Sequence, residues 1–199
     1  MQPLAADEWG DDEYAAFGTL LGIPGAKVPR AGSGHIYDPV KFPVVGLLAR
    51  HPSLAAAYLT FNAYLLQRGE LPAALREQVI LRIVHEHQSA FEWGQHVTMA
   101  GAAGITDEQI TALTRGNDGF TDGQRLVLEA TDELLANGQA TDETWNRLVA
   151  ALGTHQAIEV IFVVGAYVTT GMEFNTWKLP PQPESAVLPG RHDSHRTPS

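Results

Sequence analysis

Three polar residues in one short stretch have a spacing that suits acid–base chemistry. Ser89, Glu92 and His96 lie at positions i, i+3 and i+7, so a helix through them places the three side chains on one face. A carboxyl group and an imidazole one turn apart can form a pair in which the carboxylate fixes the imidazole tautomer and the imidazole moves protons to and from a substrate. Trp93 beside them can supply an apolar wall that shifts pKa values. The spacing therefore predicts a proton-transfer site with His96 as the general acid/base.

The same residues also fit two other arrangements. Ser89-x-x-Glu92 is a capping-box pattern, in which Glu92 would only begin a helix. A metal site is the second alternative, because His85, His87, Glu92 and His96 offer the nitrogen and oxygen ligands that zinc or iron takes. His85 and His87 point to different sides of a helix, so both can bind one ion only where the backbone turns. The sequence leaves both alternatives open.

Composition limits the chemistry further. The chain has 199 residues, no cysteine and a formal net charge of −10. Without cysteine there are no disulfides, no thiolate catalysis and no cysteine-type zinc site. The acidic balance argues against nucleic acid or an anionic membrane as the main partner. We therefore expect a protein that acts on a small-molecule substrate and is not a thiol peroxidase.

Two features of the sequence, its acidic N-terminal segment and its short apolar runs, favour a cytoplasmic location. Met1 to Asp12 is acidic and lacks the apolar stretch of a signal peptide. The longest apolar run, Val160 to Val168, is too short to span a bilayer. We expect no membrane partner.

Helical periodicity fills nearly the whole chain, and no strand pattern is visible. Helices are predicted over residues 11–21, 43–50, 52–67, 72–88, 89–102 and 154–174, with further helices beginning near residues 106, 121 and 141. Thr106-Asp107-Glu108-Gln109 and Thr121-Asp122-Gly123-Gln124 are capping-box-like starts. The expected fold class is all-α.

Three segments make up the predicted domain organisation. Residues 1–42 hold an N-terminal helix and a glycine- and proline-rich loop from Gly22 to Phe42, which is long enough to act as a lid. Residues 43–179 form the helical domain. Residues 180–199 are rich in proline and poor in apolar side chains, which predicts a disordered tail.

One acidic residue lies where an acid is unexpected. Glu159 sits inside the apolar run from Ile158 to Val168. A buried glutamate needs a partner, and we expect Arg82 or a histidine to supply it.

The core of the chain resembles the carboxymuconolactone decarboxylase and alkylhydroperoxidase-D-like family. The resemblance spans roughly Val45 to Leu179, and Leu71-Pro72-x-x-Leu75-Arg76-Glu77 carries it together with Ser89-x-x-Glu92-x-x-x-His96. In the peroxidase branch of that family a glutamate precedes Cys-x-x-Cys-x-x-x-His. Here Ser89 and Glu92 stand at the two cysteine positions and His96 is retained, so the chain looks like a cysteine-free branch.

The resemblance implies an AhpD-like helical bundle of six or more helices that assembles as homotrimers or hexamers. It also implies a cofactor-free lyase or isomerase that acts on a small organic acid or lactone by decarboxylation or proton transfer. The expected catalytic residues are His96, Glu92 and Glu77, and the expected substrate-binding residues are Ser89, Trp93, His85 and Arg82. Two other functions stay open, a metal-assisted hydrolase or oxygen-using enzyme at the histidine cluster and a non-catalytic oligomer that binds a small ligand.

Overall fold

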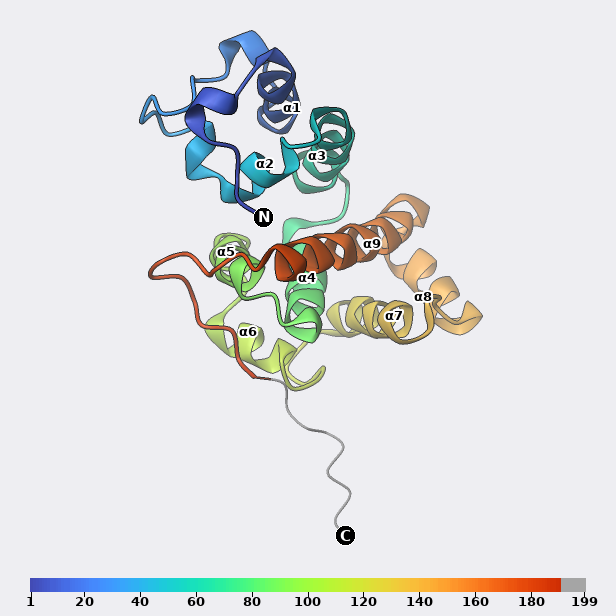
Figure 1. The fold of residues 1–199 in the computed structure, drawn as a ribbon. Helices are drawn as coiled ribbons and strands as arrows, with labels where there is room; N and C mark the ends of the chain where they lie inside the picture. Colours follow the sequence, from blue (N-terminus) through green and yellow to red (C-terminus); the bar gives the residue numbers. More distant parts are fainter. Residues whose placement is uncertain (191–199) are drawn as a thin grey trace. The chain divides into compact units, whose positions relative to one another are not determined.

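The chain is all-helical over residues 1–190, the part that the computed structural model describes (Figure 1). The α-helices are α1 (Asp11–Leu21), α2 (Pro43–Leu48), α3 (Pro52–Gln67), α4 (Ala73–His87), α5 (Ala90–Ala102), α6 (Asp107–Leu113), α7 (Asp122–Asn137), α8 (Asp142–Leu152) and α9 (Thr154–Trp177). Three short 3-10 helices are η1 (Ala6–Glu8), η2 (Gly25–Lys27) and η3 (Pro39–Lys41). The predicted fold class is confirmed.

The helices form two compact units, Met1–Gly69 and Glu70–Ser199. In the first unit, α1 packs on α3, and a core of its own surrounds the fully buried Phe17. The Phe17 ring lies 5.4 Å from that of Phe42. The division at Gly69 differs from the boundary that the sequence suggested at Phe42, because α2 and α3 pack with the N-terminal segment.

The long loop of the first unit is fixed within that unit. Asp38 is buried and accepts hydrogen bonds from the backbone N–H groups of Gly32, Gly34 and Val40, at 3.0, 2.7 and 3.1 Å. The backbone N–H of Ala31 donates to the Tyr14 hydroxyl. The loop is therefore a folded connection, and its role as a lid stays a prediction.

Helix α4 is the central element of the second unit. It contacts α5, α7 and α9 (Figure 1). Its side chains from Glu77 to His85 are all buried, which is the pattern of a helix covered on every side. Polar residues on this helix are therefore held inside the unit, where they need partners.

Helix ends in the second unit follow local sequence signals. Thr106 with Gln109 and Thr121 with Gln124 form the capping boxes at the starts of α6 and α7, as the sequence predicted. Between α4 and α5 the chain turns sharply at Gln88, which has a left-handed backbone with φ of 53°. That turn sets the direction in which α5 carries its polar residues past α4.

Glu159 on α9 binds backbone, not a charged side chain. Its two carboxylate oxygens accept from the N–H groups of Glu70 and Leu71, at 2.9 and 2.7 Å. The expectation of Arg82 or a histidine as partner was wrong. The carboxylate instead satisfies amides just before α4 that have no partner within the helix, and so it ties α9 to the start of α4.

Helix α9 meets the length and composition requirements for crossing a membrane, and 56% of its apolar window is buried inside the protein. Burial of this kind is typical of the core helix of a soluble protein. The cytoplasmic location stays a prediction.

The C-terminal segment, residues 179–190, packs against the second unit. A Cβ atom on Gly94 of α5 would lie 2.5 Å from the Ser185 Cβ, so the two residues are in close contact. The Gln88 side chain donates to the Pro189 carbonyl oxygen at 3.4 Å. The disordered tail predicted from residue 180 is therefore not found as far as residue 190, and its remainder, 191–199, lies outside the described residues.

Candidate active site

A buried carboxylate–imidazole pair joins α4 to α5. The Nδ1 atom of His96 lies 2.7 Å from Oε2 of Glu77, and the two residues are 5% and 1% exposed. The ring of Tyr167 on α9 meets the His96 ring edge to face, with centroids 5.0 Å apart. Three helices thus fix the orientation of one imidazole.

The pairing defines which nitrogen of His96 is available. A carboxylate can only accept a hydrogen bond, so in this contact Nδ1 of His96 carries the proton. The Nε2 atom makes no hydrogen bond to any residue from 1 to 190. A neutral imidazole in this tautomer presents a basic lone pair at Nε2 and can act as a general base.

Glu92 lies one turn before His96 on α5 and is 1% exposed. Neither of its oxygens has a hydrogen bond of acceptable geometry to residues 1–190. Burial raises the pKa of Glu92 to about 8; the Ser89 hydroxyl nearby offsets part of the rise and the charge of Glu173 adds to it. Glu92 is therefore a neutral carboxylic acid at pH 7.

This geometry corrects the predicted pairing of Glu92 with His96. Spacing within α5 places the two side chains one turn apart, but Glu77 reaches His96 from the facing helix and takes its Nδ1 atom. The capping-box alternative for Glu92 was also wrong, because the Ser89 side chain makes no capping hydrogen bond at the start of α5.

Helices α5 and α9 run past each other in opposite directions. His96 meets Tyr167 near one end, and Phe91 meets Phe174 near the other, with ring centroids 5.5 Å apart. This register brings Glu173 opposite Glu92, which agrees with the electrostatic effect of Glu173 on the pKa of Glu92. An aromatic residue within an apolar helix gives no sequence signal, so the role of Tyr167 beside His96 was missed.

Ser89, Trp93 and His85 are buried on the same part of the unit. The rings of His85 and Trp93 lie 6.2 Å apart. Burial lowers the pKa of His85, and the nearby Glu86 charge offsets part of this, so the imidazole is neutral at pH 7. Of the three residues, Ser89 acts on Glu92 directly, and the contact of all three with a substrate stays a prediction.

Arg82 makes structural hydrogen bonds, whereas the sequence suggested that it binds a substrate. Its guanidinium donates to both carboxylate oxygens of Asp132, at 2.9 and 3.0 Å, and to Gly116 O and Asn117 Oδ1 at 2.8 and 2.7 Å. Arg82 therefore fastens α7 and the preceding loop to α4. With these donors in use, the structure gives no support to its predicted contact with a substrate at His96.

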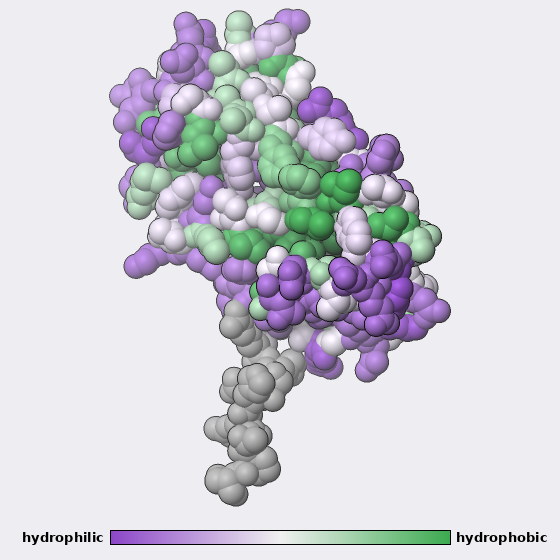
Figure 2. All heavy atoms as spheres, turned by 90° about the vertical axis from the view of Figure 1, so that its right-hand side faces the viewer, coloured by the Kyte–Doolittle hydropathy of each residue, from purple (hydrophilic) through white to green (hydrophobic). Residues whose placement is uncertain are grey.

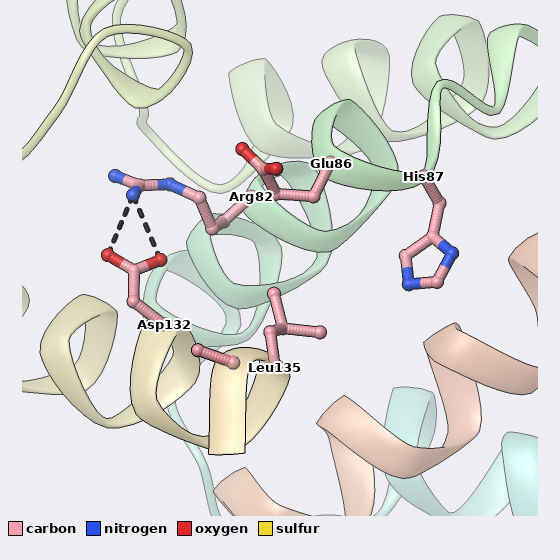
Figure 3. A pocket seen from close by; sticks show the side chains of 6 residues that line it. Arg82, Glu86, His87, Asp132 and Leu135 are labelled. Carbon is pink, nitrogen blue, oxygen red and sulfur yellow. Dashed lines mark hydrogen bonds and ion pairs between the residues drawn. The ribbon is translucent and has the colours of Figure 1, made fainter. Parts of the chain in front are cut away.

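Arg82 also borders a surface pocket of about 500 Å³. Its lining residues are Arg82, Glu86, His87, Asp132, Leu135 and Ala136 (Figure 3). Figure 3 shows the Arg82–Asp132 pair on one side of this pocket and His87 on the other. Glu77, Glu92 and His96 do not line it, so it is separate from the carboxylate–imidazole pair.

The metal-binding alternative finds no donor set in residues 1–190. No three histidine, aspartate or glutamate side chains there converge as metal ligands do. His96 is bound to Glu77, and His85 is packed against Trp93. The cluster of His85, His87, Glu92 and His96 is not assembled as one site.

Comparison with known proteins finds a family match over part of the chain. The sequence model of the Carboxymuconolactone decarboxylase family matches residues 52–133. The matched stretch contains both Glu77 and His96, whereas α8 and α9 follow it.

Structural comparison supports the same fold. The chain is similar to a protein of unknown function from Agrobacterium tumefaciens, ATU0492, which is proposed to be the antioxidant defence protein AhpD. The TM-score is 0.62 at 18% identity, over 69% of this chain and 97% of that one. This likeness shows an AhpD-like fold. No curated protein sequence matches the chain significantly.

Proposed function

We propose that this carboxymuconolactone decarboxylase family protein is a cofactor-free acid–base enzyme, a lyase or isomerase for a small organic acid or lactone. The observation that carries the proposal is the buried hydrogen bond of 2.7 Å between Glu77 and His96. A carboxylate held in that position orients the imidazole and stabilises the imidazolium that forms when Nε2 takes up a proton.

Two groups in different protonation states divide the chemistry. Nε2 of His96 removes a proton from a carbon next to a carbonyl group, and the electron pair moves onto the carbonyl oxygen. The neutral Glu92 carboxyl group donates a hydrogen bond to that oxygen as its charge develops. Return of the proton to another carbon completes an isomerisation.

Decarboxylation uses the same residues in a different order. The bond between the carboxylate and the adjacent carbon breaks, carbon dioxide leaves, and the electron pair moves onto the neighbouring carbonyl oxygen. His96 in its protonated form then gives a proton to the carbon. Both reactions need an oriented imidazole and a nearby hydrogen-bond donor. The site therefore supports acid–base catalysis as a class and does not select between isomerisation and decarboxylation.

Thiol chemistry has no place in this proposal. The similar Agrobacterium protein is described as an antioxidant defence protein, but this chain has no cysteine and cannot cycle through a sulfenic acid or a disulfide. Ser89 and Glu92 occupy the positions that cysteines hold in the peroxidase branch.

Solvent deuterium exchange tests the proposal without knowledge of the product. Lactones, β-keto acids and unsaturated dicarboxylic acids would be incubated with the protein in D2O, and NMR would follow both exchange at carbon and release of carbon dioxide. We expect at least one compound to react, and His96→Gln to lower the rate by at least about a hundredfold, the usual scale for a positioned acid or base.

The matched control is His155→Gln, since the His155 side chain is 76% exposed and pairs with the surface residue Glu70. This variant should keep the wild-type rate. Reaction that persists in His96→Gln, or a panel in which no compound reacts, would contradict the proposed function.

A further inference from the structure

The C-terminal segment, residues 179–190, returns from α9 to the turn between α4 and α5. Figure 1 shows it leaving α9 and running past α5. Ser185 lies against Gly94 of α5, where an added Cβ would come within 2.5 Å of the Ser185 Cβ. Near the end of the segment, the Gln88 side chain donates to the Pro189 carbonyl oxygen at 3.4 Å. The segment is therefore fastened on both sides of this turn.

His85, in the last turn of α4, lies under the end of the C-terminal segment. The backbone of Gly190 acts on its imidazole, and the Trp93 ring lies 6.2 Å from it between centroids. His85 is only 3% exposed, and neither ring nitrogen has a hydrogen bond of acceptable geometry to residues 1–190. An imidazole packed in this way is neutral, because a charge there has no water to stabilise it.

The charged groups around His85 do not replace that water. Glu86 approaches Nδ1 at 3.7 Å, but its side chain is 49% exposed. Burial lowers the pKa of His85; the charge of Glu86 and the Gly190 backbone offset part of the fall, and the charge of Arg82 adds to it. On α5, Glu92 beside Trp93 is neutral at pH 7. Protonation of His85 is therefore unfavourable while the C-terminal segment is in place.

Few other interactions hold the C-terminal segment. Four of its twelve residues are proline, which has no backbone N–H to donate, and residues 180–184 are exposed. The Ser185 N–H donates to the Gln182 carbonyl oxygen at 3.1 Å, a bond within the segment itself. A segment with little buried surface and few hydrogen bonds opens at low cost, so one buried histidine is enough to bias it.

We propose that the C-terminal segment is a pH-sensitive cover, which is released when the buried His85 beneath it takes up a proton. In the closed state, with the segment over His85, an imidazolium is cut off from water. In the open state, with the segment moved away, water reaches the ring. Proton uptake therefore favours the open state. This device is independent of the acid–base chemistry proposed for His96.

The direction of the pH dependence follows from the two states of His85. In the closed state its pKa lies below the ordinary value of 6.5, and in the open state it returns toward that value. The closed state is therefore most favoured above about pH 6.5. As the pH falls below this value, the ratio of open to closed protein rises, by up to about tenfold per pH unit.

A single introduced thiol measures the opening, because the chain has no cysteine of its own. Ser185→Cys places the thiol against Gly94, where labelling is slowed until the segment moves away. Val187→Cys places it on the same segment at a position that is 88% exposed, and so reports the intrinsic reactivity of a thiol at each pH. The ratio of the two labelling rates is followed from pH 7 to pH 5.

We expect this ratio to rise at least about threefold from pH 7 to pH 5. With His85→Gln added, it should stay constant, because glutamine has no charge at either pH. The matched control is His87→Gln, since His87 is two residues away and lines the surface pocket that does not include His85; this variant should keep the rise. Circular dichroism at both pH values establishes that each variant is folded.

Two results would overturn the proposal. One is a labelling ratio that does not change between pH 7 and pH 5. The other is a rise that is equally large in His85→Gln, which would assign the pH dependence to carboxyl groups. Deuterium exchange on substrates tests His96 in a separate measurement, so failure of either proposal leaves the other in place.

Discussion

Glu92 determines a specific dependence of stability on pH. Its pKa in the folded protein is about 8, against an ordinary value of 4.5. Between these two values the folded state holds a proton that the unfolded state has lost, so this residue lowers the free energy of unfolding as the pH rises from about 4.5 to about 8. Ser89 at the N-cap of α5 and Glu173 on α9 are the polar groups that act on it.

Replacing Glu92 by glutamine removes that proton and keeps the shape of the side chain. We expect the melting temperature of Glu92→Gln to exceed that of wild type by a margin that grows from pH 5 to pH 8. Thermal denaturation of both proteins across this range measures the margin. A constant difference at all pH values would show that Glu92 ionises normally in the folded protein.

Activity should also depend on the Glu92 carboxyl group, but here Glu92→Gln should be harmful, whereas it should raise the stability. Ionisation of Glu92 above about pH 8 removes the donor that we propose for the developing oxyanion, so wild-type turnover should fall there. Glu92→Gln should be slower by about a hundredfold or more below pH 8, the scale of a lost oxyanion donor, and should lack the alkaline fall. The pH–rate profiles of the two proteins decide this, once an exchanging compound is known.

Glu77 contacts both Arg76 and His96, so its substitution should change both stability and activity. Glu77→Gln leaves Arg76 as a buried cation without its counter-charge, which is costly on the scale of buried pairs, about 3 to 5 kcal/mol. We expect a clear fall in melting temperature together with loss of activity. The double variant Arg76→Gln/Glu77→Gln should recover much of the stability but none of the activity, and additive effects of the two changes would contradict the coupling.

The sequence identified these residues better than it identified their contacts. Glu77 and His96 were both predicted from the spacing and the resemblance. Spacing along a helix reports which face a side chain occupies, but not which helix lies opposite, so spacing alone paired Glu92 with His96, and only the resemblance connected Glu77 with His96. Arg76 was part of the matched motif, but its ion pair with Glu77 was not predicted, because an arginine in the first turns of a helix is usually a surface residue.

At the scale of elements, the contact between α5 and the C-terminal segment depends on one glycine. A Cβ on Gly94 would lie 2.5 Å from Cβ and 2.6 Å from Oγ of Ser185, too close for both to stay in place. Gly94→Ala should keep or increase helicity, since alanine favours helix, while it displaces residues 179–190 from α5.

Limited proteolysis and hydrogen exchange over residues 179–190 measure that displacement. Gly101→Ala on the same helix is the matched control, because a Cβ there meets nothing within 4 Å, and it should leave protection unchanged. Gly94→Ala/Ser185→Gly should restore protection, since it removes the second Cβ. Unchanged protection in Gly94→Ala alone would show that the segment does not depend on this contact.

Elements with local signals were predictable and those with distant contacts were not. The capping boxes at Thr106 and Thr121 contain all the residues that they require within four positions. The C-terminal segment has a composition typical of disorder, yet it is placed by Gly94 and Gln88, about ninety or more residues earlier. Glu159 shows the same limit, because its backbone partners at Glu70 and Leu71 leave no trace in side-chain patterns.

At the scale of the whole molecule, the division at Gly69 separates α3 from the helices that carry the acid–base residues. The match to the family model, over residues 52–133, nevertheless begins with α3. Composition marked the glycine- and proline-rich loop as a boundary, but a change in composition reports where helices stop and not which helices pack together. The packing of α1 on α3 is a long-range property, and it decided the unit boundary.

Assembly is the remaining property of the whole molecule, and hydrophobic side chains do reach its surface (Figure 2). On α9 the exposed apolar residues are Ile158, Ile161, Phe162 and Met172. Ile161, Phe162 and Met172 follow Ile158 at three, four and fourteen positions, which places the four side chains on one side of the helix. An apolar stripe of this kind is typical of an interface between subunits.

We therefore predict a homo-oligomer, a trimer or hexamer as the family resemblance implies, in which α9 contributes to the interface. Light scattering at micromolar concentration should give a multiple of the 21.5 kDa chain mass. Ile161→Glu should shift the mass toward the monomer, because a charge in an apolar contact is strongly unfavourable, whereas Ala150→Glu on the exposed side of α8 should leave it unchanged. A monomeric wild-type protein would contradict the prediction, and an oligomer that survives Ile161→Glu would place the interface on another face.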